Sequence, residues 1–410
     1  ARGGTARHAQ HRLRGGLVSA QIALALVVVT GSGLLMRTFE RLHSVRPGFD
    51  PAHVETFWVS LPPGGYKSDT SIVRFFSNLV DRVSALPGVT AVGLTSRLPL
   101  EPHGLSPNPI YPENDESFTT KLPPLEFMTS ANGDYFRAMG IPLIAGRTFQ
   151  KMEAEPAGTA IISRGVAELF WKDPTGVGAL GKRFRPLPTD PWYTVVGVVG
   201  DMRDTSLAAA PSRAVYFPET IENGGAPKQT RRTMALVVRT TGDGPSRAPA
   251  VQQAMHELDP GLPVFDVRSL STVLSAATEQ LTFIIIMLGS AAVVTLLLGA
   301  IGLYGVLAYV VTLRTRELGI RIALGATPRA IAAAMTRYGL ALAGIGIACG
   351  FALFAIIARF LRALLFGVAV TDPVTLGVSA GILLAIAIVA SSVPARRAAR
   401  VDPADALRAE

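Results

Sequence analysis

The chain has 410 residues, of which 49% are hydrophobic and 17% are charged, and its formal net charge is +9. A soluble globular protein has about 25% charged residues, so this composition indicates a membrane protein. The arginines that make the chain basic lie beside apolar segments, which favours a lipid bilayer, and not nucleic acid, as the anionic partner. The one cysteine, Cys349, lies in an apolar run, so no disulfide can form within the chain.

The first apolar segment, Gly15–Met36, is long enough to cross a membrane and carries no charged side chain. A signal peptide is the alternative, because arginines precede the segment. The apolar run exceeds the roughly 7–15 residues of a signal-peptide core, and no A-x-A cleavage site follows it. We therefore expect a transmembrane helix over 15–36, after an N-terminal segment, 1–14. Because the sequence opens at Ala1 without a methionine, we also expect a fragment or the rear half of a longer chain.

The long segment that follows, residues 37–280, is typical of a soluble α+β domain, because short apolar runs alternate with turn residues. Strands are expected at Val54–Leu61, Val89–Thr95, Ala160–Ser163, Tyr193–Gly200, Met234–Arg239 and Pro263–Val267, and helices at Ser71–Leu86, Tyr135–Met139, Val166–Trp171 and Pro249–Leu258. The polar, proline-rich stretch Pro99–Pro124 is expected to be an exposed loop. The order of elements predicts two lobes, with an outer lobe near 132–220 inserted into a lobe made from both flanks.

Three further segments without a charged side chain are long enough to span a bilayer: Leu281–Leu313, Tyr338–Ala358 and Pro373–Ala395. Arginines are dense before the first span, in the link 314–337 and in the tail 396–410, but sparse between the third and fourth spans. The positive-inside rule places these three dense segments in the cytoplasm and residues 37–280 outside. The expected fold is an α-helical membrane protein with four transmembrane helices and an α+β extracytoplasmic domain of two lobes.

One segment resembles a nucleotide-binding motif. Gly176–Lys182 matches the start of a P-loop, but Arg183 stands where the motif needs Ser or Thr. Pro186 and Pro188 prevent the helix that must follow, so we expect a glycine-rich turn. The six histidines show no metal spacing, and no hydrolase or metalloprotease motif occurs. We therefore expect no enzyme activity, no metal and no cofactor bound by this chain.

Glycines recur at helical spacing inside the spans. Gly299, Gly302 and Gly305 lie in the second span, Gly346 and Gly350 in the third, and Gly377 and Gly381 in the fourth. Small residues let helix backbones approach closely in lipid, where no hydrophobic driving force acts between helices. The motifs predict either packing inside the bundle or a seam between two such units.

The link between the second and third spans has the pattern of a short amphipathic helix. Leu318 and Ile322 fall near one face, and Glu317 precedes Arg321 by four residues, the favourable order for a helical ion pair. Thr327, followed by proline, suits the N-cap of the next helix. This helix is expected either to rest on the lipid headgroups or to dock a cytoplasmic partner.

The same link, Arg316–Ala326, with the sequence RELGIRIALGA, resembles the inner-link motif of FtsX/MacB-type ABC transporter permeases. The tail Pro394–Arg408 resembles the end of the same permease domain. Upstream, the segments Val45–Asp50, Tyr135–Leu143, Gly146–Phe149 and Val195–Asp201 resemble the MacB-like periplasmic core. The likeness covers nearly the whole chain in one order, and it is greatest to permeases that carry this unit twice in one polypeptide.

The resemblance implies a non-catalytic permease of the bacterial inner membrane, with both termini in the cytoplasm and the large domain in the periplasm. It implies mechanotransmission in efflux or envelope export, driven by ATP that a cytoplasmic ABC ATPase binds. A second permease unit, as a homodimer or as a pseudo-dimer within a duplicated chain, and a periplasmic adaptor are further partners. The residues expected to contact the ATPase are Arg316, Glu317, Gly319, Arg321, Ala323, Leu324 and Gly325.

An alternative function is a membrane receptor or a scaffold, whose outer domain binds a peptide, a lipid or an envelope hydrolase. The size of the region between the first two spans motivates this alternative. It predicts that the outer domain binds its ligand without an ATPase.

Overall fold

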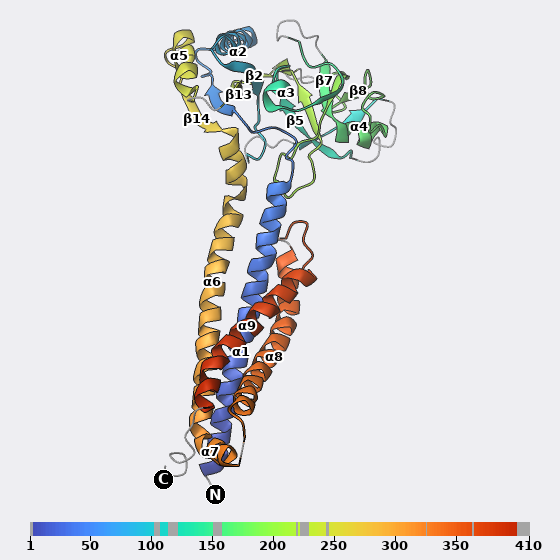
Figure 1. The fold of residues 1–410 in the computed structure, drawn as a ribbon. Helices are drawn as coiled ribbons and strands as arrows, with labels where there is room; N and C mark the ends of the chain where they lie inside the picture. The colour runs from blue at the N-terminus through green and yellow to red at the C-terminus, as the bar shows by residue number, and fades with distance from the viewer. Residues whose placement is uncertain are drawn as a thin grey trace. The chain divides into compact units, whose positions relative to one another are not determined.

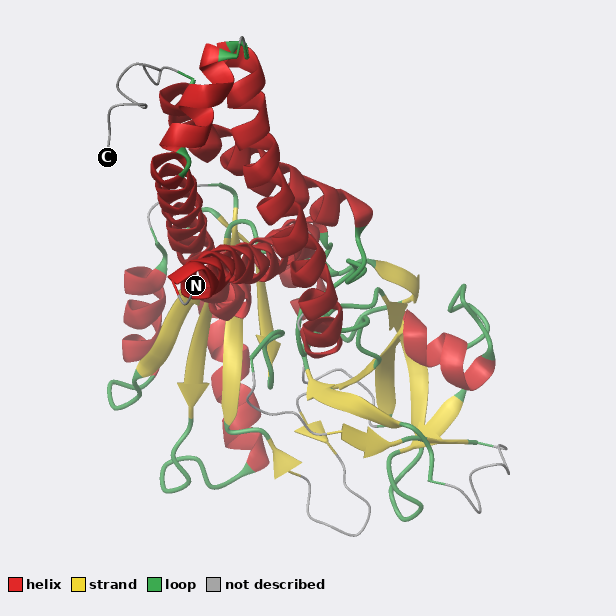
Figure 2. Ribbon diagram, turned by 90° about the horizontal axis from the view of Figure 1, so that it is seen from below, coloured by secondary structure: helices red, strands yellow, loops and turns green. Residues whose placement is uncertain are grey.

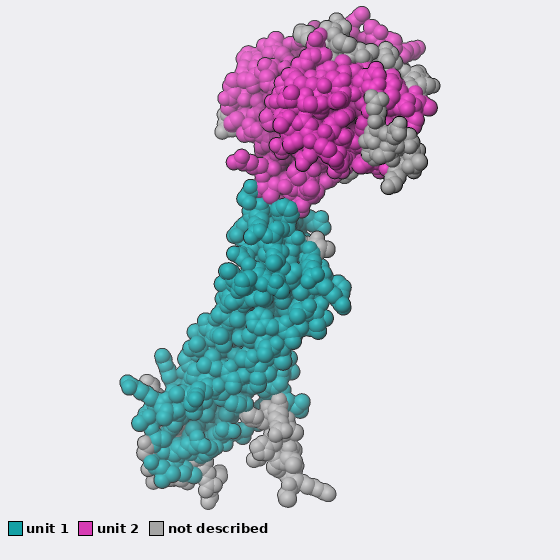
Figure 3. Space-filling view, turned by 90° about the vertical axis from the view of Figure 1, so that its right-hand side faces the viewer, with its two compact units in different colours: residues 1–44, 279–410 teal, residues 45–278 magenta. Residues whose placement is uncertain are grey.

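The computed structural model describes residues 3–101, 107–113, 122–150, 158–218, 220–221, 229–242, 246–324, 326–362 and 365–399. The chain divides into two compact units, which Figure 3 shows in different colours. Residues 1–44 and 279–410 form one, called the membrane unit below, and residues 45–278 form the other, called the outer unit.

The described residues of the membrane unit form helices joined by short loops and contain no strand (Figure 1). Its long helices are α1 (Gly3–Ser44), α6 (Leu270–Leu313, which starts in the outer unit), α8 (Pro328–Leu361) and α9 (Pro373–Ala398). All four are long and apolar enough to cross a membrane. The short helix α7 (Thr315–Ala323) lies between α6 and α8 in the chain. The predicted four spans are therefore confirmed.

The helices extend beyond the charge-free segments. α1 begins at Gly3 and α8 at Pro328, so residues 3–14 and 328–337, expected outside the spans, continue the helices. Thr327 caps α8 as predicted, since its side chain accepts a hydrogen bond from the amide of Ala330. Charged side chains near a helix end can reach the lipid headgroups. The helices can therefore continue past the charge-free segments from which the spans are predicted.

Helix α1 packs against α8 and α9 in the centre of the membrane unit. Their shared core contains Val18, Ile22, Leu26, Ala343, Ile347, Leu383 and Ala387. The Ser19 hydroxyl of α1 donates to the carbonyl oxygen of Leu342 in α8 at 3.1 Å. By contrast, only 6% of the residues in the most apolar stretch of α6 are buried, against 50% in the corresponding stretch of α1. Most residues of this stretch of α6 therefore lack a partner among the described residues.

The outer unit contains a four-stranded antiparallel sheet in the order β14-β1-β13-β2. The strands are β1 (Val54–Ser60), β2 (Val89–Thr95), β13 (Thr233–Thr240) and β14 (Val264–Ser269). Side chains alternate along β13, so Leu236 joins the core beneath α2 (Asp69–Ser84) and α5 (Ala248–Leu258), and Val237 joins the core on the other face. Both faces are buried, which explains why β13 reads as a continuous apolar run.

A second sheet of eight strands has the order β3-β5-β10-β7-β9-β8-β4, with β6 pairing to β9. Its strands are β3 (Pro107–Pro109), β4 (Tyr111–Pro112), β5 (Leu125–Ser130), β6 (Leu143–Gly146), β7 (Thr159–Ser163), β8 (Arg183–Arg185), β9 (Tyr193–Val199) and β10 (Ala214–Phe217). Helix α4 (Arg164–Trp171) packs on β7, β9 and β10. A short pair, β11 (Thr220–Ile221) and β12 (Gln229–Thr230), completes the unit. Figure 2 shows the strands of the two sheets as separate groups.

The two sheets correspond to the two predicted lobes, but the predicted lobe boundary is wrong. The inserted lobe begins at β3 and not near residue 132, because β3, β4 and β5 all belong to the eight-stranded sheet. The expected loop Pro99–Pro124 therefore contains two short strands. Strand β3 includes Pro107 and Pro109, and it lies at the sheet edge, where a missing backbone N–H is tolerated.

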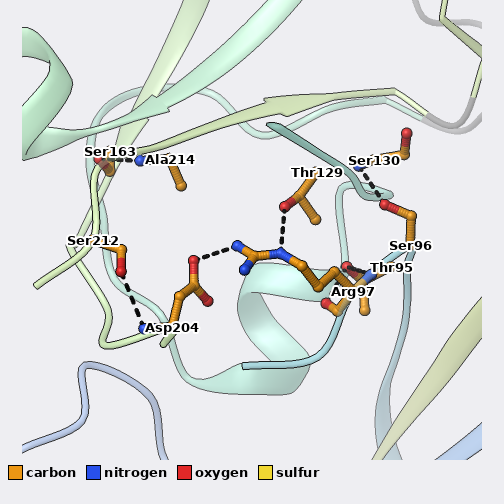
Figure 4. Close-up of polar contacts among 9 residues, drawn as sticks. All are labelled: Thr95, Ser96, Arg97, Thr129, Ser130, Ser163, Asp204, Ser212 and Ala214. Carbon is orange, nitrogen blue, oxygen red and sulfur yellow. Dashed lines mark hydrogen bonds and ion pairs between the residues drawn. The ribbon is translucent and has the colours of Figure 1, made fainter. Parts of the chain in front are cut away.

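Short helix α3 (Tyr135–Met139) packs between the lobes. Beside it lies a buried ion pair, in which Arg97, after β2, donates to Asp204, after β9, at 2.5 Å (Figure 4). Both side chains are almost fully buried, with 2% and 1% exposure. The Arg97 Nε also donates to the Thr129 hydroxyl on β5. The pair thus links the end of a first-sheet strand to the second lobe.

Candidate functional site

The helix α7 forms next to the end of α6. Helix α6 ends at Leu313, Arg314 occupies the N-cap of α7, and the amide of Leu318 donates to the Arg314 carbonyl at 2.8 Å. At the other end, the amide of Ala326 donates to the Arg321 carbonyl at 2.9 Å. Backbone hydrogen bonds therefore mark both ends of the helix. No side chain caps the α7 N-terminus.

One face of α7 is fixed to the membrane unit. Leu318 is 3% exposed and belongs to the core that also contains Ile331 and Met335 of α8. Gly319 is buried, and Ile322 packs against the same core. This face therefore holds α7 against the packed helices.

The opposite face of α7 is open to solvent. Glu317 and Arg321 form the predicted ion pair, with side chains 48% and 57% exposed. Two apolar side chains are exposed beside them, Ile320 at 44% and Leu324 at 82%. An exposed apolar pair next to a fixed charge pair is typical of a surface that a partner covers.

The structure places the predicted coupling residues on different faces. Glu317, Arg321 and Leu324 are exposed, while Gly319 is buried against the bundle. Arg316 and Ala323 belong to α7 by their backbone, and Gly325 lies outside the described residues. The sequence motif did not single out Ile320. Its position next to the charged residues, on the face opposite Leu318 and Ile322, is a signal that helical spacing could have supplied.

The span glycines also separate into two groups. A Cβ atom on Gly346 would lie 2.8 Å from both the Ser19 carbonyl and the Ile22 Cβ, and one on Gly350 would lie 2.7 Å from Leu26. These two glycines pack against α1 within the chain. A Cβ on Gly377 or Gly381 would meet nothing within 4 Å. Of the motifs in the third and fourth spans, therefore, only the one in the third span is used for packing among the described residues.

The segment that resembles a P-loop is a turn, and the carboxylate of Asp173, just before it, binds its backbone amides. Asp173 Oδ2 accepts hydrogen bonds from the amides of Gly178 at 2.7 Å and Ala179 at 3.2 Å. In a P-loop, such amides hold phosphate oxygens. Strand β8 follows the turn where a P-loop has a helix. The prediction of a glycine-rich turn is therefore confirmed.

Two family models match this chain. The model of the MacB-like periplasmic core domain matches residues 18–258, and the model of the FtsX-like permease C-terminal domain matches residues 289–403. The second match contains α7 and both helices that follow it.

Curated relatives include a "Macrolide export ATP-binding/permease protein MacB" of Azoarcus sp., 29% identical over 73% of this chain and 45% of the relative. A "Pyoverdine export ATP-binding/permease protein PvdT" of Pseudomonas putida is 29% identical over 43% of this chain and 27% of that protein. A crystal structure of the periplasmic region of MacB from Actinobacillus actinomycetemcomitans covers 58% of this chain and 97% of its own, with 13% identity and a TM-score of 0.36.

The chain spans less than half of the length of these curated relatives. The periplasmic core match alone covers more than half of this chain, in the order that places one apolar helix before the outer unit and three after it. The chain belongs to the FtsX/MacB-type family of ABC transporter permeases, multi-pass proteins of the inner membrane with a periplasmic domain.

Proposed function

We propose that this chain is a non-catalytic permease unit that couples ATP hydrolysis by a cytoplasmic ABC ATPase to movement of its periplasmic domain. ATP is bound by the ATPase and not by this chain. The arginine-rich end of the membrane unit, which carries α7, faces the cytoplasm together with both termini. The direction of transport is export, since the relatives are named as exporters of a macrolide and of pyoverdine.

The observation that carries this proposal is the two-sided character of α7. Leu318 anchors the helix in the bundle, whereas Leu324 is 82% exposed next to the charged pair. An apolar residue left in solvent lowers stability, so a partner that buries it gains binding energy. The ATPase is proposed to bind Glu317, Ile320, Arg321 and Leu324 directly.

The route from α7 to the outer unit is continuous along the chain. Only Arg314 separates α7 from α6, and α6 is a single helix of 44 residues. Its first turn lies in the outer unit, where Leu270 and Val273 are buried in the core that contains Tyr135. A helix resists compression along its hydrogen-bonded axis, so a displacement of α7 along the axis of α6 reaches that core.

A second permease unit is proposed to cover α6. The exposed face of this helix carries Phe283, Ile286, Met287, Val293, Val294, Leu297, Leu298 and Ile301, each more than half exposed. Branched and aromatic side chains on one face supply the van der Waals packing that helix association in lipid requires. The second unit is either another copy or the other half of a longer chain.

The test is recovery of the ATPase with the tagged full chain. The substitutions Arg321→Glu and Leu324→Glu each remove one part of the proposed contact, and deletion of residues 314–326 removes all of it. We expect ATPase recovery to fall about tenfold or more for each variant, as expected for the loss of about 1.4 kcal/mol at a contact residue.

Arg359→Glu is the matched control, because Arg359 is an exposed arginine at the other end of α8. It changes the net charge by the same amount and should leave recovery unchanged. Full recovery of the ATPase with the deletion variant would reject the proposed contact.

A further inference from the structure

A groove of about 420 Å³ runs between α1 and α6 in the membrane unit. Its lining consists of Leu13, Arg14, Leu17, Val18 and Gln21 from α1, with Gly302, Gly305, Val306 and Tyr309 from α6. Arg14 is the only charged residue of this lining. The groove is therefore apolar, with a single positively charged side chain.

The cation lies at the end of the groove nearest to the arginine-rich end of the bundle. The guanidinium carbon of Arg14 lies 4.3 Å from the centre of the Tyr309 ring. Stacking on the ring fixes the guanidinium and leaves its edge N–H groups free to donate. Nearby on the same helix, the Tyr304 hydroxyl accepts a hydrogen bond from Arg397 at 2.9 Å. Arginine and tyrosine at one depth are typical of the membrane interface.

The body of the groove is open because of its glycines. A Cβ atom on Gly305 would meet nothing within 4 Å, so this wall lacks a side chain where the helices face one another. From Arg14 to Gln21, the groove follows α1 for seven residues, about 10 Å. One leaflet of the hydrocarbon core is about 15 Å thick, so the groove spans most of one leaflet.

The inner end of the groove contains a polar atom without a partner. The Gln21 amide oxygen is buried and makes no hydrogen bond among the described residues. It lies against Gly302, where a Cβ would approach it to 2.5 Å. A buried amide oxygen needs a donor, and a lipid carries none at this depth, so recognition of a headgroup depends on Arg14 at the other end of the groove.

We propose that this groove binds an anionic phospholipid. The phosphate accepts hydrogen bonds from Arg14, and one acyl chain lies along Leu17, Val18 and Val306, with its polar glycerol region beside Tyr309. Basic pockets between transmembrane helices at the interface favour anionic headgroups, and a leaflet-long apolar groove fits an acyl chain. This site is independent of the ATPase contact on α7.

Charge favours a lipid over a helix from a second copy. The described acidic residues of the membrane unit are Glu40, Glu279, Glu317 and Asp372. Of these, Glu317 is paired with Arg321, and Asp372 with Arg37. A second copy would bring the apolar face of its α6 to the groove, and the one acidic residue of that helix, Glu279, lies 30 residues before Tyr309, far from the Arg14 end of the groove. The phosphate of an anionic lipid supplies the missing negative charge.

The experiment uses tryptophan quenching by brominated lipid. The three native tryptophans, Trp58, Trp171 and Trp192, all lie in the outer unit, so a Leu17→Trp variant reports on the groove. The full chain is placed in phosphatidylcholine vesicles that contain a small fraction of either brominated phosphatidylglycerol or brominated phosphatidylcholine. We expect brominated phosphatidylglycerol to quench the new tryptophan several-fold more strongly.

Two further variants separate the charge from the cavity. Arg14→Gln in the Leu17→Trp background should lower the preference for phosphatidylglycerol about fivefold, the effect of about one surface arginine. Gly305→Leu should fill the groove and reduce quenching by both lipids. Gly344→Leu is its matched control, since Gly344 is an exposed glycine on α8 with nothing within 4 Å of an added Cβ, and it should have no effect.

Equal quenching by the two brominated lipids, or a preference that Arg14→Gln leaves unchanged, would overturn the proposal. Absence of quenching by either lipid would mean that a protein helix fills the groove, which would overturn it as well. None of these readouts depends on ATPase binding, so failure here is distinguishable from failure of the proposed function.

Discussion

Arg37 of α1 forms an ion pair with Asp372, the residue that caps the N-terminus of α9. The same Asp372 oxygen accepts hydrogen bonds from the Thr375 amide at 2.8 Å and the Thr375 hydroxyl at 2.6 Å. One carboxylate therefore closes α9 and joins it to α1. This contact lies at the opposite end of the bundle from α7. It joins two helices that also share an apolar core.

We expect Asp372→Ala to lower the free energy of unfolding of the membrane unit, mainly through loss of the N-cap. Asp372→Asn keeps the cap acceptor but removes the charge. Because Arg37 is 39% exposed, solvent screening makes that loss smaller. The measurement is the denaturation midpoint in detergent. Equal losses for the two variants would contradict the assignment of the main effect to the cap.

The buried pair of Arg97 and Asp204 predicts a larger effect on the outer unit. Burial raises the pKa of the Asp204 carboxyl, while Arg97 opposes that rise. Arg97→Met would leave Asp204 buried without its partner and should cost about 3–5 kcal/mol near neutral pH. The double variant Arg97→Met/Asp204→Leu should recover most of that loss. Tryptophan fluorescence during denaturation reports on the outer unit alone, because all three tryptophans lie there.

The sign of the pH dependence follows from the raised pKa. A folded-state pKa above the unfolded value means that the folded state binds the proton more tightly, so stability falls as the pH rises. Because Arg97 opposes the rise in the Asp204 pKa, its removal makes the folded state bind the proton still more tightly. The loss of stability caused by Arg97→Met should therefore be smaller at pH 5 than at pH 8. A loss that grows on acidification would show that Asp204 is not the charge left uncompensated.

The packing of the third-span glycines predicts an asymmetry between two similar motifs. Gly346→Ala places a methyl group 2.8 Å from Ile22 and from the Ser19 carbonyl, so α1 and α8 must separate at a cost of about 1–3 kcal/mol. Gly377→Ala has open space and should be nearly neutral in the same denaturation assay. If Gly377→Ala were the more destabilising, the assignment of these motifs would be reversed.

The closed turn at Asp173 predicts a loss of stability that depends on pH. Hydrogen bonds from the Thr175 hydroxyl, and then from the amides of Thr175, Gly178 and Ala179, lower the pKa of Asp173. A lowered folded-state pKa contributes stability above the unfolded value, and this contribution is lost as the pH falls. Asp173→Asn should therefore destabilise the outer unit at pH 7, and its effect should shrink as the pH falls below 3.8, the ordinary pKa of an aspartate.

Glu168→Gln is the control for Asp173→Asn, because Glu168 is an exposed carboxylate on the neighbouring helix α4. Both variants are followed by tryptophan fluorescence. Equal effects of the two variants at pH 7 would contradict the role of Asp173 in closing the turn.

The sequence predicted best what depends on local composition. Four charge-free segments mark the spans, because a charge in hydrocarbon is costly whatever the fold around it. The strand Tyr193–Val199 was also predictable, since a run buried on both faces has an unmistakable composition. Sheet membership depends on distant pairing, so the composition of Pro107–Pro109 predicts a loop and not the edge strand that pairs with β5.

The candidate site was only partly predictable for the same reason. Helical spacing indicates the pair of Glu317 and Arg321, because both residues lie on one helix. It does not show that Gly319 faces the bundle and Leu324 faces solvent, since that depends on residues in α8. Likewise, identical glycine spacing in α8 and α9 gave no indication that only one motif packs on α1.

The proposed coupling to a cytoplasmic ATPase depends on the orientation of α7 in a living cell. Cys349 is the one native cysteine, so a Cys349→Ser chain can carry a single new cysteine at Arg329, in the first turn of α8, or at Thr189, in the outer unit. We expect a membrane-impermeant maleimide applied to the periplasmic side to label Thr189→Cys and to leave Arg329→Cys unlabelled until the membrane is permeabilised. Labelling of Arg329→Cys in intact spheroplasts would place α7 outside the cytoplasm and contradict the coupling mechanism.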